Sequence, residues 1–139
     1  MKTIFSTLIV SLLLVIGNTQ NSYSQEKEKQ NYVVLTKNVE QLKPILLAAK
    51  ALSKEDGEQF GNFEIIVCGK GIQEITNLET LKPHLEKAEI LGAKIVACGF
   101  SLKKFNVDPK NLPPGITTVE NGILRNFELQ KKGYLSLEL

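Results

Sequence analysis

Short apolar runs alternate with longer amphipathic stretches along the chain. Short runs that are mostly apolar and rich in β-branched residues occur at residues 32–36, 63–68, 94–99 and 116–119. Runs of this kind are typical of strands that are buried on both faces of a sheet. Residues 134–139 instead alternate apolar and polar side chains, which predicts a half-buried edge strand. The pattern therefore predicts a sheet of about five strands.

The stretch after the first predicted strand has the spacing of an amphipathic helix. Apolar residues recur every three or four positions from residue 39 to residue 52. Asn38 is a candidate N-cap for this helix. Pro44 leaves a second start open, in which it occupies the first helical turn and residues 38–42 form an irregular approach.

Three further helices are expected between the remaining strands. One falls within residues 72–91, where Pro83 would interrupt or restart it and Gly92 is a natural stop. Ser101 can cap a short helix, and residues 122–132 are expected to form the last one. Strands and helices that alternate in this order predict an α/β fold with a mostly parallel sheet, covered on both faces.

The beginning of the chain has the pattern of a secretory signal peptide over residues 1–24. Lys2 precedes an apolar run, and small residues end at Ser24. Cleavage near Ser24 would leave a charged flexible leader over residues 25–30 and a single domain over residues 31–139. The product is expected to be periplasmic or secreted. The apolar run is short for a membrane span, so no stable membrane insertion is expected.

Composition argues against several classes of function. The 17 basic and 15 acidic residues give a formal net charge of +2, which makes no case for nucleic acid or an anionic membrane as partner. Two cysteines and one histidine are too few for a disulfide scaffold or for a metal site of the usual spacing. Gly69-Lys70-Gly71 lacks the spacing of a phosphate-binding loop, and the dinucleotide fingerprint is missing, so no cofactor is expected.

Both cysteines stand at the carboxyl ends of predicted strands. Cys68 is followed by Gly69 and Cys98 by Gly99. In an open parallel sheet, ligands bind beyond these strand ends. The two Cys-Gly pairs are therefore the first candidates for a site.

The surroundings of Cys98 favour a thiolate. The amides of a helix capped at Ser101 would point toward the sulfur, and Lys103 and Lys104 add positive charge nearby. A helix end contributes only about 0.3–1 kcal/mol to a neighbouring charge. A lysine or a second backbone donor would therefore have to help before Cys98 became strongly reactive.

Other interpretations of these residues stay open at the level of sequence. Each cysteine could be a small apolar residue at the end of a buried strand. A disulfide between Cys68 and Cys98 is conceivable if their strands are neighbours, about 4.8 Å apart, but not if another strand separates them by roughly 10 Å. Glu120 and Asn121, after the fourth strand, could line the same crevice as Cys98 or be ordinary turn residues.

Four further segments of the chain are distinctive. They are Gly-Ala-Lys-Ile-Val-Ala-Cys-Gly-Phe-Ser-Leu at 92–102, Leu-Pro-Pro-Gly at 112–115, Val-Glu-Asn-Gly at 119–122, and Leu-Gln with Gly-Tyr within 129–134. With these segments the chain resembles the DsrE/DsrF-like sulfur-carrier family, and the match spans nearly all of the chain after the predicted cleavage position. The resemblance implies a three-layer α/β/α sandwich, assembly into homo-oligomers such as trimers or hexamers, and a cysteine that carries sulfur as a persulfide.

Cys98 is the position that matches the family's sulfur-carrying cysteine. Cys68 stands where many relatives have histidine, and it could supply a resolving thiol or merely fill space. The leading hypothesis is an exported persulfide carrier or sulfurtransferase-relay component that uses Cys98, supported by Gly99, Ser101 and Lys103. Its partners would be sulfur donor and acceptor proteins or small sulfane-sulfur compounds.

Two rival functions come from other classes. One is an oligomeric small-ligand-binding or assembly module in which Cys98 is structural and sealed from solvent. The other is a thiol oxidoreductase, which needs Cys68 and Cys98 within bridging distance. A carrier that only relays sulfur is not strictly an enzyme, whereas a relay that completes the transfer would be a sulfurtransferase.

Overall fold

A five-stranded sheet forms the centre of the computed structural model, which describes residues 28–139. All neighbouring strands run parallel, in the order β4-β3-β2-β1-β5. The strands are β1 (Gln30–Thr36), β2 (Phe60–Val67), β3 (Ala93–Cys98), β4 (Ile116–Val119) and β5 (Leu135–Glu138). The predicted parallel α/β fold is confirmed. The predicted signal peptide and its cleavage position near Ser24 lie outside the described residues.

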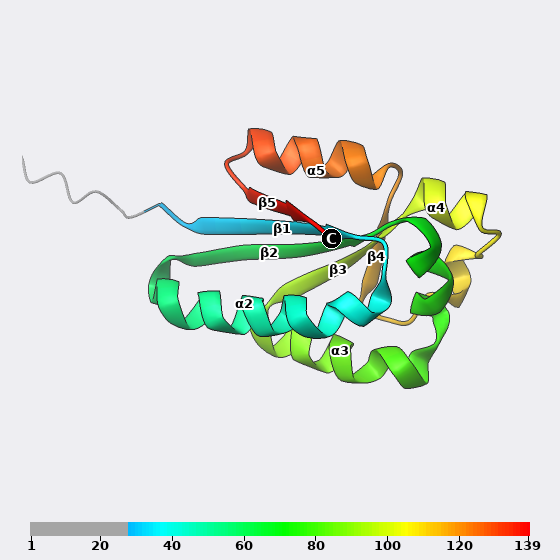
Figure 1. Ribbon diagram of the computed structural model, residues 1–139, viewed down its shortest axis with the longest axis horizontal. Helices are drawn as coiled ribbons and strands as arrows, with labels where there is room; N and C mark the ends of the chain where they lie inside the picture. The colour runs from blue at the N-terminus through cyan, green and yellow to red at the C-terminus, as the bar shows by residue number, and fades with distance from the viewer. Residues whose placement is uncertain (1–27) are drawn as a thin grey trace, which may run out of the picture.

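Helices cover both faces of the sheet, so the fold has three layers (Figure 1). α2 (Leu42–Asp56) and α3 (Leu78–Leu91) lie on one face, and α5 (Gly122–Lys131) lies on the other. α4 (Gly99–Lys104) follows β3 directly, beyond the carboxyl ends of the strands. Short 3-10 helices complete the structure: η2 (Val39–Gln41), η3 (Gly57–Gln59), η4 (Gly69–Thr76) and η5 (Pro109–Asn111). Over residues 28–139, none of these helices is long and apolar enough to cross a bilayer.

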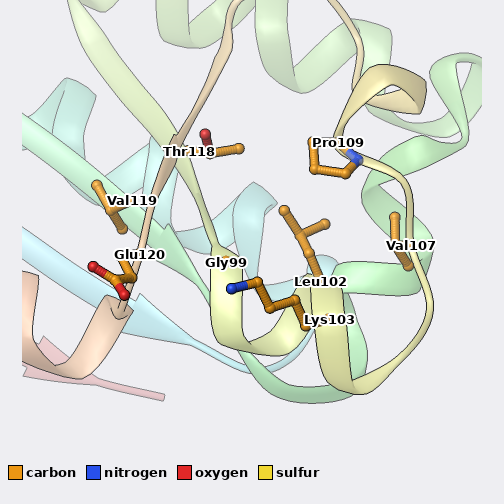
Figure 2. A pocket seen from close by; sticks show the side chains of 8 residues that line it. All are labelled: Gly99, Leu102, Lys103, Val107, Pro109, Thr118, Val119 and Glu120. Atoms are coloured by element: carbon orange, nitrogen blue, oxygen red, sulfur yellow. The ribbon is translucent and has the colours of Figure 1, made fainter.

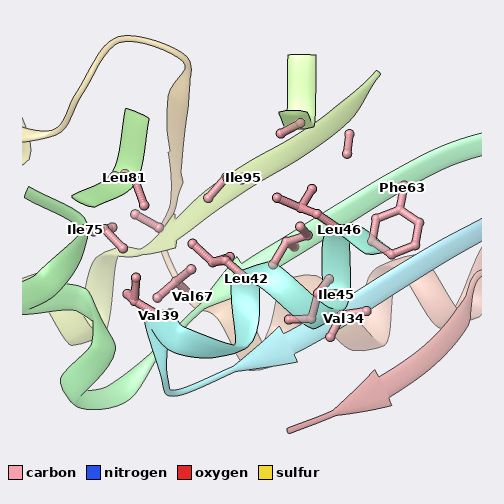
Figure 3. Packing of buried hydrophobic residues seen from close by; sticks show 14 of the residues in the cluster. Val34, Val39, Leu42, Ile45, Leu46, Phe63, Val67, Ile75, Leu81 and Ile95 are labelled. Carbon is pink, nitrogen blue, oxygen red and sulfur yellow. The ribbon is translucent and has the colours of Figure 1, made fainter. Parts of the chain in front are cut away.

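The two faces of the sheet bury apolar cores of different size. The larger core lies between the sheet and the α2/α3 layer, where side chains of α2 point toward the strands (Figure 3). The smaller core lies under α5 and contains Val33, Leu35, Ile66, Cys68, Cys98 and Leu129. Both cysteines are therefore on the face that α5 covers.

Pro44 and Pro83 occupy different positions in their helices. α2 begins at Leu42 after the short η2, so Pro44 occupies its first turn, and the later of the two predicted starts is confirmed. The expectation that Pro83 interrupts or restarts the next helix is wrong, because α3 runs through it without a break. Asn77 caps α3 by accepting a hydrogen bond from the backbone N–H of Thr80, and Leu81 is fully buried, so packing outweighs the lost backbone bond.

Strand order settles how close the cysteines are. β2 and β3 are neighbours, with Val67 paired to Ala97, so Cys68 and Cys98 follow at adjacent positions. The alternative in which another strand separates them does not hold.

β5 is an edge strand, as expected, but its leucines are not half buried. The register pairs Leu137 with Val34, which places Leu137 on the face that α2 covers. Leu137 is nevertheless 56% exposed, because α2 does not reach over the edge of the sheet. The structure therefore presents an apolar edge to the solvent.

Candidate functional site

Cys68 and Cys98 lie side by side beneath the first turn of α5. They are 6% and 4% exposed, and neither is in a disulfide. Gly122, the first residue of α5, approaches both so closely that a Cβ atom there would lie 2.5 Å from Cys68 Sγ and 3.2 Å from Cys98 Cβ. Only glycine fits this position without moving its neighbours.

Hydrogen-bond donors converge on the sulfur of Cys98. The backbone N–H of Gly122 donates to Cys98 Sγ over 3.3 Å. The hydroxyl and the backbone N–H of Ser101 and the thiol of Cys68 also lower the pKa of Cys98 through hydrogen bonding. Burial raises the pKa of Cys98, but these hydrogen bonds outweigh it, so the pKa falls below its ordinary value. The site therefore stabilises a thiolate with neutral donors.

The pKa of Cys68 shifts in the opposite direction. Burial, the charge of the Cys98 thiolate and the hydrogen bond to Cys98 together raise the pKa of Cys68 to about 12. At neutral pH it remains a thiol that donates its proton to the neighbouring sulfur. The pair thus combines one cysteine whose pKa is lowered with one whose pKa is raised.

Ser101 is held in place by the other Cys-Gly turn. Its hydroxyl accepts a hydrogen bond from the backbone N–H of Gly69 over 2.9 Å, which leaves the hydroxyl proton free to point at Cys98. The expectation that Ser101 caps α4 is wrong, because α4 starts at Gly99 and Cys98 itself occupies the N-cap position. Ser101 is instead the third residue of the helix, where both its backbone and its side chain reach the sulfur.

Gly99 allows the chain to pass tightly beside the end of β4. A Cβ atom there would lie 3.0 Å from the carbonyl oxygen of Val119 and 3.1 Å from that of Glu120. The Glu120 carbonyl also accepts a hydrogen bond from the N–H of Phe100 over 3.0 Å. This contact fixes the start of α4 against the neighbouring strand.

Lys103 and the Glu120 side chain lie apart from the sulfur. They line a cavity of about 190 Å³ between α4 and β4, together with Gly99, Leu102, Val107, Pro109, Thr118 and Val119 (Figure 2). Lys103 is not among the groups that lower the pKa of Cys98. Neither side chain contributes to the donor set around the sulfur.

Asn121 positions the donor that the sequence interpretation missed. Its side chain accepts hydrogen bonds from the N–H groups of Ile123 and Leu124, at 3.0 and 3.2 Å, and so caps α5. The cap leaves the N–H of Gly122 free to reach Cys98. The available signal was the Asn-Gly pair before a predicted helix, which is typical of an N-cap followed by a close backbone approach.

A second cavity opens beside Cys68. We call it the Cys68 cavity; it has a volume of about 300 Å³ and is lined by Leu35, Lys37, Cys68, Ile123, Asn126, Phe127, Gln130, Ser136 and Glu138. Lys37 and Glu138 form an exposed ion pair of 2.6 Å across it. Lys37 lowers and Glu138 raises the pKa of Cys68. Cys98 is not part of this wall, so a molecule in the cavity meets Cys68 first.

The described part of the chain offers no set of side chains that could bind a metal ion. Residues 28–139 contain no cluster of three or more His, Cys, Asp or Glu side chains that could hold an ion. The one histidine, His84, lies on α3, which covers the opposite face of the sheet.

Comparisons with known proteins identify structures of a similar fold but no established function. No family model and no curated protein matches the chain. Among solved structures, the protein of unknown function MTH1491 from Methanobacterium thermoautotrophicum matches with a TM-score of 0.63 and 14% identity, over 81% of this chain and 100% of that one. The conserved protein of unknown function BT1422 from Bacteroides thetaiotaomicron matches with a TM-score of 0.55 and 22% identity, over 78% and 95%. At these identities, the chain shares its fold with proteins whose own function is not established.

Proposed function

We propose that this chain is an exported sulfur-handling protein of the DsrE/DsrF-like type, in which Cys98 accepts sulfane sulfur and holds it as a persulfide. The donor set around Cys98 is the observation that carries the proposal. Amides of Gly122 and Ser101, the Ser101 hydroxyl and the Cys68 thiol all stabilise negative charge on one sulfur atom. A buried cysteine that served only as an apolar filler would not need them.

The chemistry is a sulfur transfer between thiolates. The Cys98 thiolate attacks the terminal sulfur of a persulfide donor, a new S–S bond forms at Cys98, and the donor's S–S bond breaks so that the donor leaves as a thiolate. The same hydrogen bonds then stabilise the persulfide anion. Discharge repeats the exchange with an acceptor thiol.

The proposal requires that a sulfur donor can reach Cys98. Cys98 is 4% exposed, so the donor must reach it past Cys68 or after the first turn of α5 moves aside. The Cys68 cavity supplies the nearer route, because its wall includes the sulfur that contacts Cys98.

Intact mass of the protein after treatment with a low-molecular-weight persulfide tests the proposal. The variant Cys98→Ala should gain no sulfur. The variant Cys68→Ala, in which Cys98 is the remaining thiol, should gain one reducible sulfur atom. Circular dichroism confirms that each variant is folded. If Cys68→Ala gains no sulfur while folded, Cys98 is not a carrier.

Burial favours a second candidate function, an assembly or ligand-binding module with a structural Cys98. Exposed apolar side chains on α5, on β5 and at the residue after β5 would then serve contacts between subunits: Ile123, Leu124, Phe127, Leu135, Leu137 and Leu139. Resistance of Cys98 to persulfide and to thiol reagents in the folded protein, together with a stable oligomer, would favour this candidate.

A further inference from the structure

The side-by-side placement of Cys68 and Cys98 indicates a use for the second thiol. We infer that Cys68 resolves the persulfide on Cys98: its sulfur attacks Cys98 Sγ, hydrogen sulfide leaves, and a Cys68–Cys98 disulfide remains. This inference rests on the proposed function of Cys98, and it turns a carrier into a protein that reduces sulfane sulfur to sulfide.

Backbone geometry permits the bond. Cys68 and Cys98 follow the paired residues Val67 and Ala97 on neighbouring parallel strands. Such strands lie about 4.8 Å apart, within the range of about 4.4–6.8 Å that Cα atoms span across a disulfide. Both side chains point to the α5 face, where one hypothetical atom on Gly122 would touch both of them. The strand register and the common face of the two side chains therefore meet the backbone requirement of a disulfide.

The hydrogen bond between the two cysteines already brings together the atoms that must react. In the resting site, the Cys68 thiol donates to the Cys98 sulfur. When Cys98 becomes a persulfide, its Sγ is the atom that Cys68 must attack, and the outer sulfur is the leaving group. The proton of Cys68 transfers to that outer sulfur, which leaves as hydrogen sulfide.

Atoms and electrons balance in this step. One thiol and one persulfide give one disulfide and one hydrogen sulfide. The outer sulfur is reduced by two electrons, and the two cysteine sulfurs together supply them. An external dithiol reductant, which becomes oxidised in turn, returns the pair to thiols for another turnover.

Charge changes at the site assist Cys68 after loading. The thiolate of Cys98 is one of the causes that raise the pKa of Cys68, and loading moves this charge outward to the added sulfur. Lys37 lies across the Cys68 cavity and opposes the remaining shift. Cys68 is therefore least acidic in the empty site and becomes more acidic when there is a persulfide to attack.

The Cys68 cavity fits the two other requirements of the cycle. It adjoins Cys68, so hydrogen sulfide can leave through it. A reductant must attack one sulfur of the disulfide, and Cys68 is the one that a molecule in this cavity meets. Attack there expels Cys98, the better leaving group because its thiolate is stabilised.

The test uses the reduced protein with one equivalent of cysteine persulfide, followed by sulfide assay, intact mass and a non-reducing peptide map. Wild type should release sulfide, lose the mass of two hydrogen atoms, and yield a peptide joined through Cys68 and Cys98. Cys68→Ala should instead keep the added sulfur, with sulfide release at least about tenfold slower, since the neighbouring thiol is lost. Cys68→Ser is the second variant, should the alanine fail to fold.

The outcomes separate this inference from the proposed function. If wild type and Cys68→Ala both keep a stable persulfide on Cys98 and release sulfide equally slowly, the resolving role is wrong and the carrier stands. If Cys98→Ala takes up sulfur on Cys68 while Cys68→Ala takes up none, the carrier assignment itself fails. A disulfide in wild type without sulfide release would also overturn the resolving role.

Discussion

Replacing Gly122 by alanine tests the packing and the electrostatics of the site together. The new Cβ would lie 2.5 Å from Cys68 Sγ and 2.8 Å from Ile66 Cγ2. Atoms cannot stay at such distances, so the first turn of α5 must lift away from the sheet. Forcing an extra carbon into a packed core typically costs about 1–3 kcal/mol of unfolding free energy.

Lifting α5 should also weaken the thiolate. The N–H of Gly122 moves away from Cys98 Sγ, which it now meets at 3.3 Å. A hydrogen bond to a charged group is worth about 1.5–3 kcal/mol, which corresponds to a rise of roughly one to two units in the pKa of Cys98. Ultraviolet absorbance of the thiolate against pH measures this rise without a reagent having to enter the site, and urea unfolding measures the stability.

Two comparison variants make the result interpretable. Gly92→Ala has φ +66° and nothing within 4 Å, so it should lose stability through backbone strain without changing the pKa of Cys98. The double variant Cys68→Ala/Gly122→Ala removes the closer clash and should recover part of the lost stability. If Gly122→Ala unfolds and titrates like wild type, the close approach of α5 to the sulfurs is wrong.

Three other changes address separate contacts. Ser101→Ala removes a donor to Cys98 and the acceptor for the Gly69 N–H, so absorbance titration should show a higher pKa for Cys98, and urea unfolding a loss of about 1–3 kcal/mol. Stability of wild type should fall as pH rises from about 9 toward 12, because Cys68 ionises in the unfolded chain first, and Cys68→Ala should flatten this slope in urea unfolding. Glu64→Gln should lower the unfolding free energy by about 1–3 kcal/mol, because it removes the negative charge and one of the two acceptors that Arg125 contacts at 2.8 Å each.

Two of these changes have a matched control. For the ion pair of Glu64, the exposed 4.0 Å pair of Lys82 and Glu86 should contribute almost nothing, so Glu86→Gln should leave stability unchanged. For the alkaline slope, the control is Tyr32→Phe. A hydrogen bond with Asp56 and burial raise the pKa of Tyr32 to about 12, so Tyr32 also contributes to this slope, and the variant distinguishes its contribution from that of Cys68. A slope unchanged by Cys68→Ala, or a Ser101→Ala protein with an unaltered thiolate titration, would contradict the roles assigned to these residues.

The fold could be predicted from local pattern because buried strands and amphipathic helices differ in period. The runs that became β2 and β3 each contain an unbroken apolar stretch, at residues 65–67 and 95–98, as burial on both faces requires. Pro83 was misjudged because a fully buried neighbour, Leu81, holds α3 together through tertiary contacts that no local pattern records. The exposed leucines of β5 were misjudged for the same reason, since the extent of α2 over the sheet is not a local property.

The site was predictable only in part. Cys-Gly pairs at strand ends identified Cys68 and Cys98, because the carboxyl ends of parallel strands meet at one edge. Their contact depends on strand order, which the sequence left open. The donor from Gly122 comes from a segment 24 residues farther along the chain, brought back over the sheet by a crossover. Of the two lysines near Cys98 in sequence, by contrast, Lys103 lines a different cavity and Lys104 lies over the ring of Phe105.

The cap of α5 couples the acidity of the thiol to the seating of a helix. Asn121 fixes the first turn, the first turn aims the Gly122 N–H, and that N–H bears on Cys98. The outer side of the same turn carries Ile123, Leu124 and the rim of the Cys68 cavity. A contact that displaces this turn therefore moves the Gly122 N–H and changes how readily Cys98 ionises. In this way, binding at the surface of the molecule can alter the reactivity of a buried sulfur.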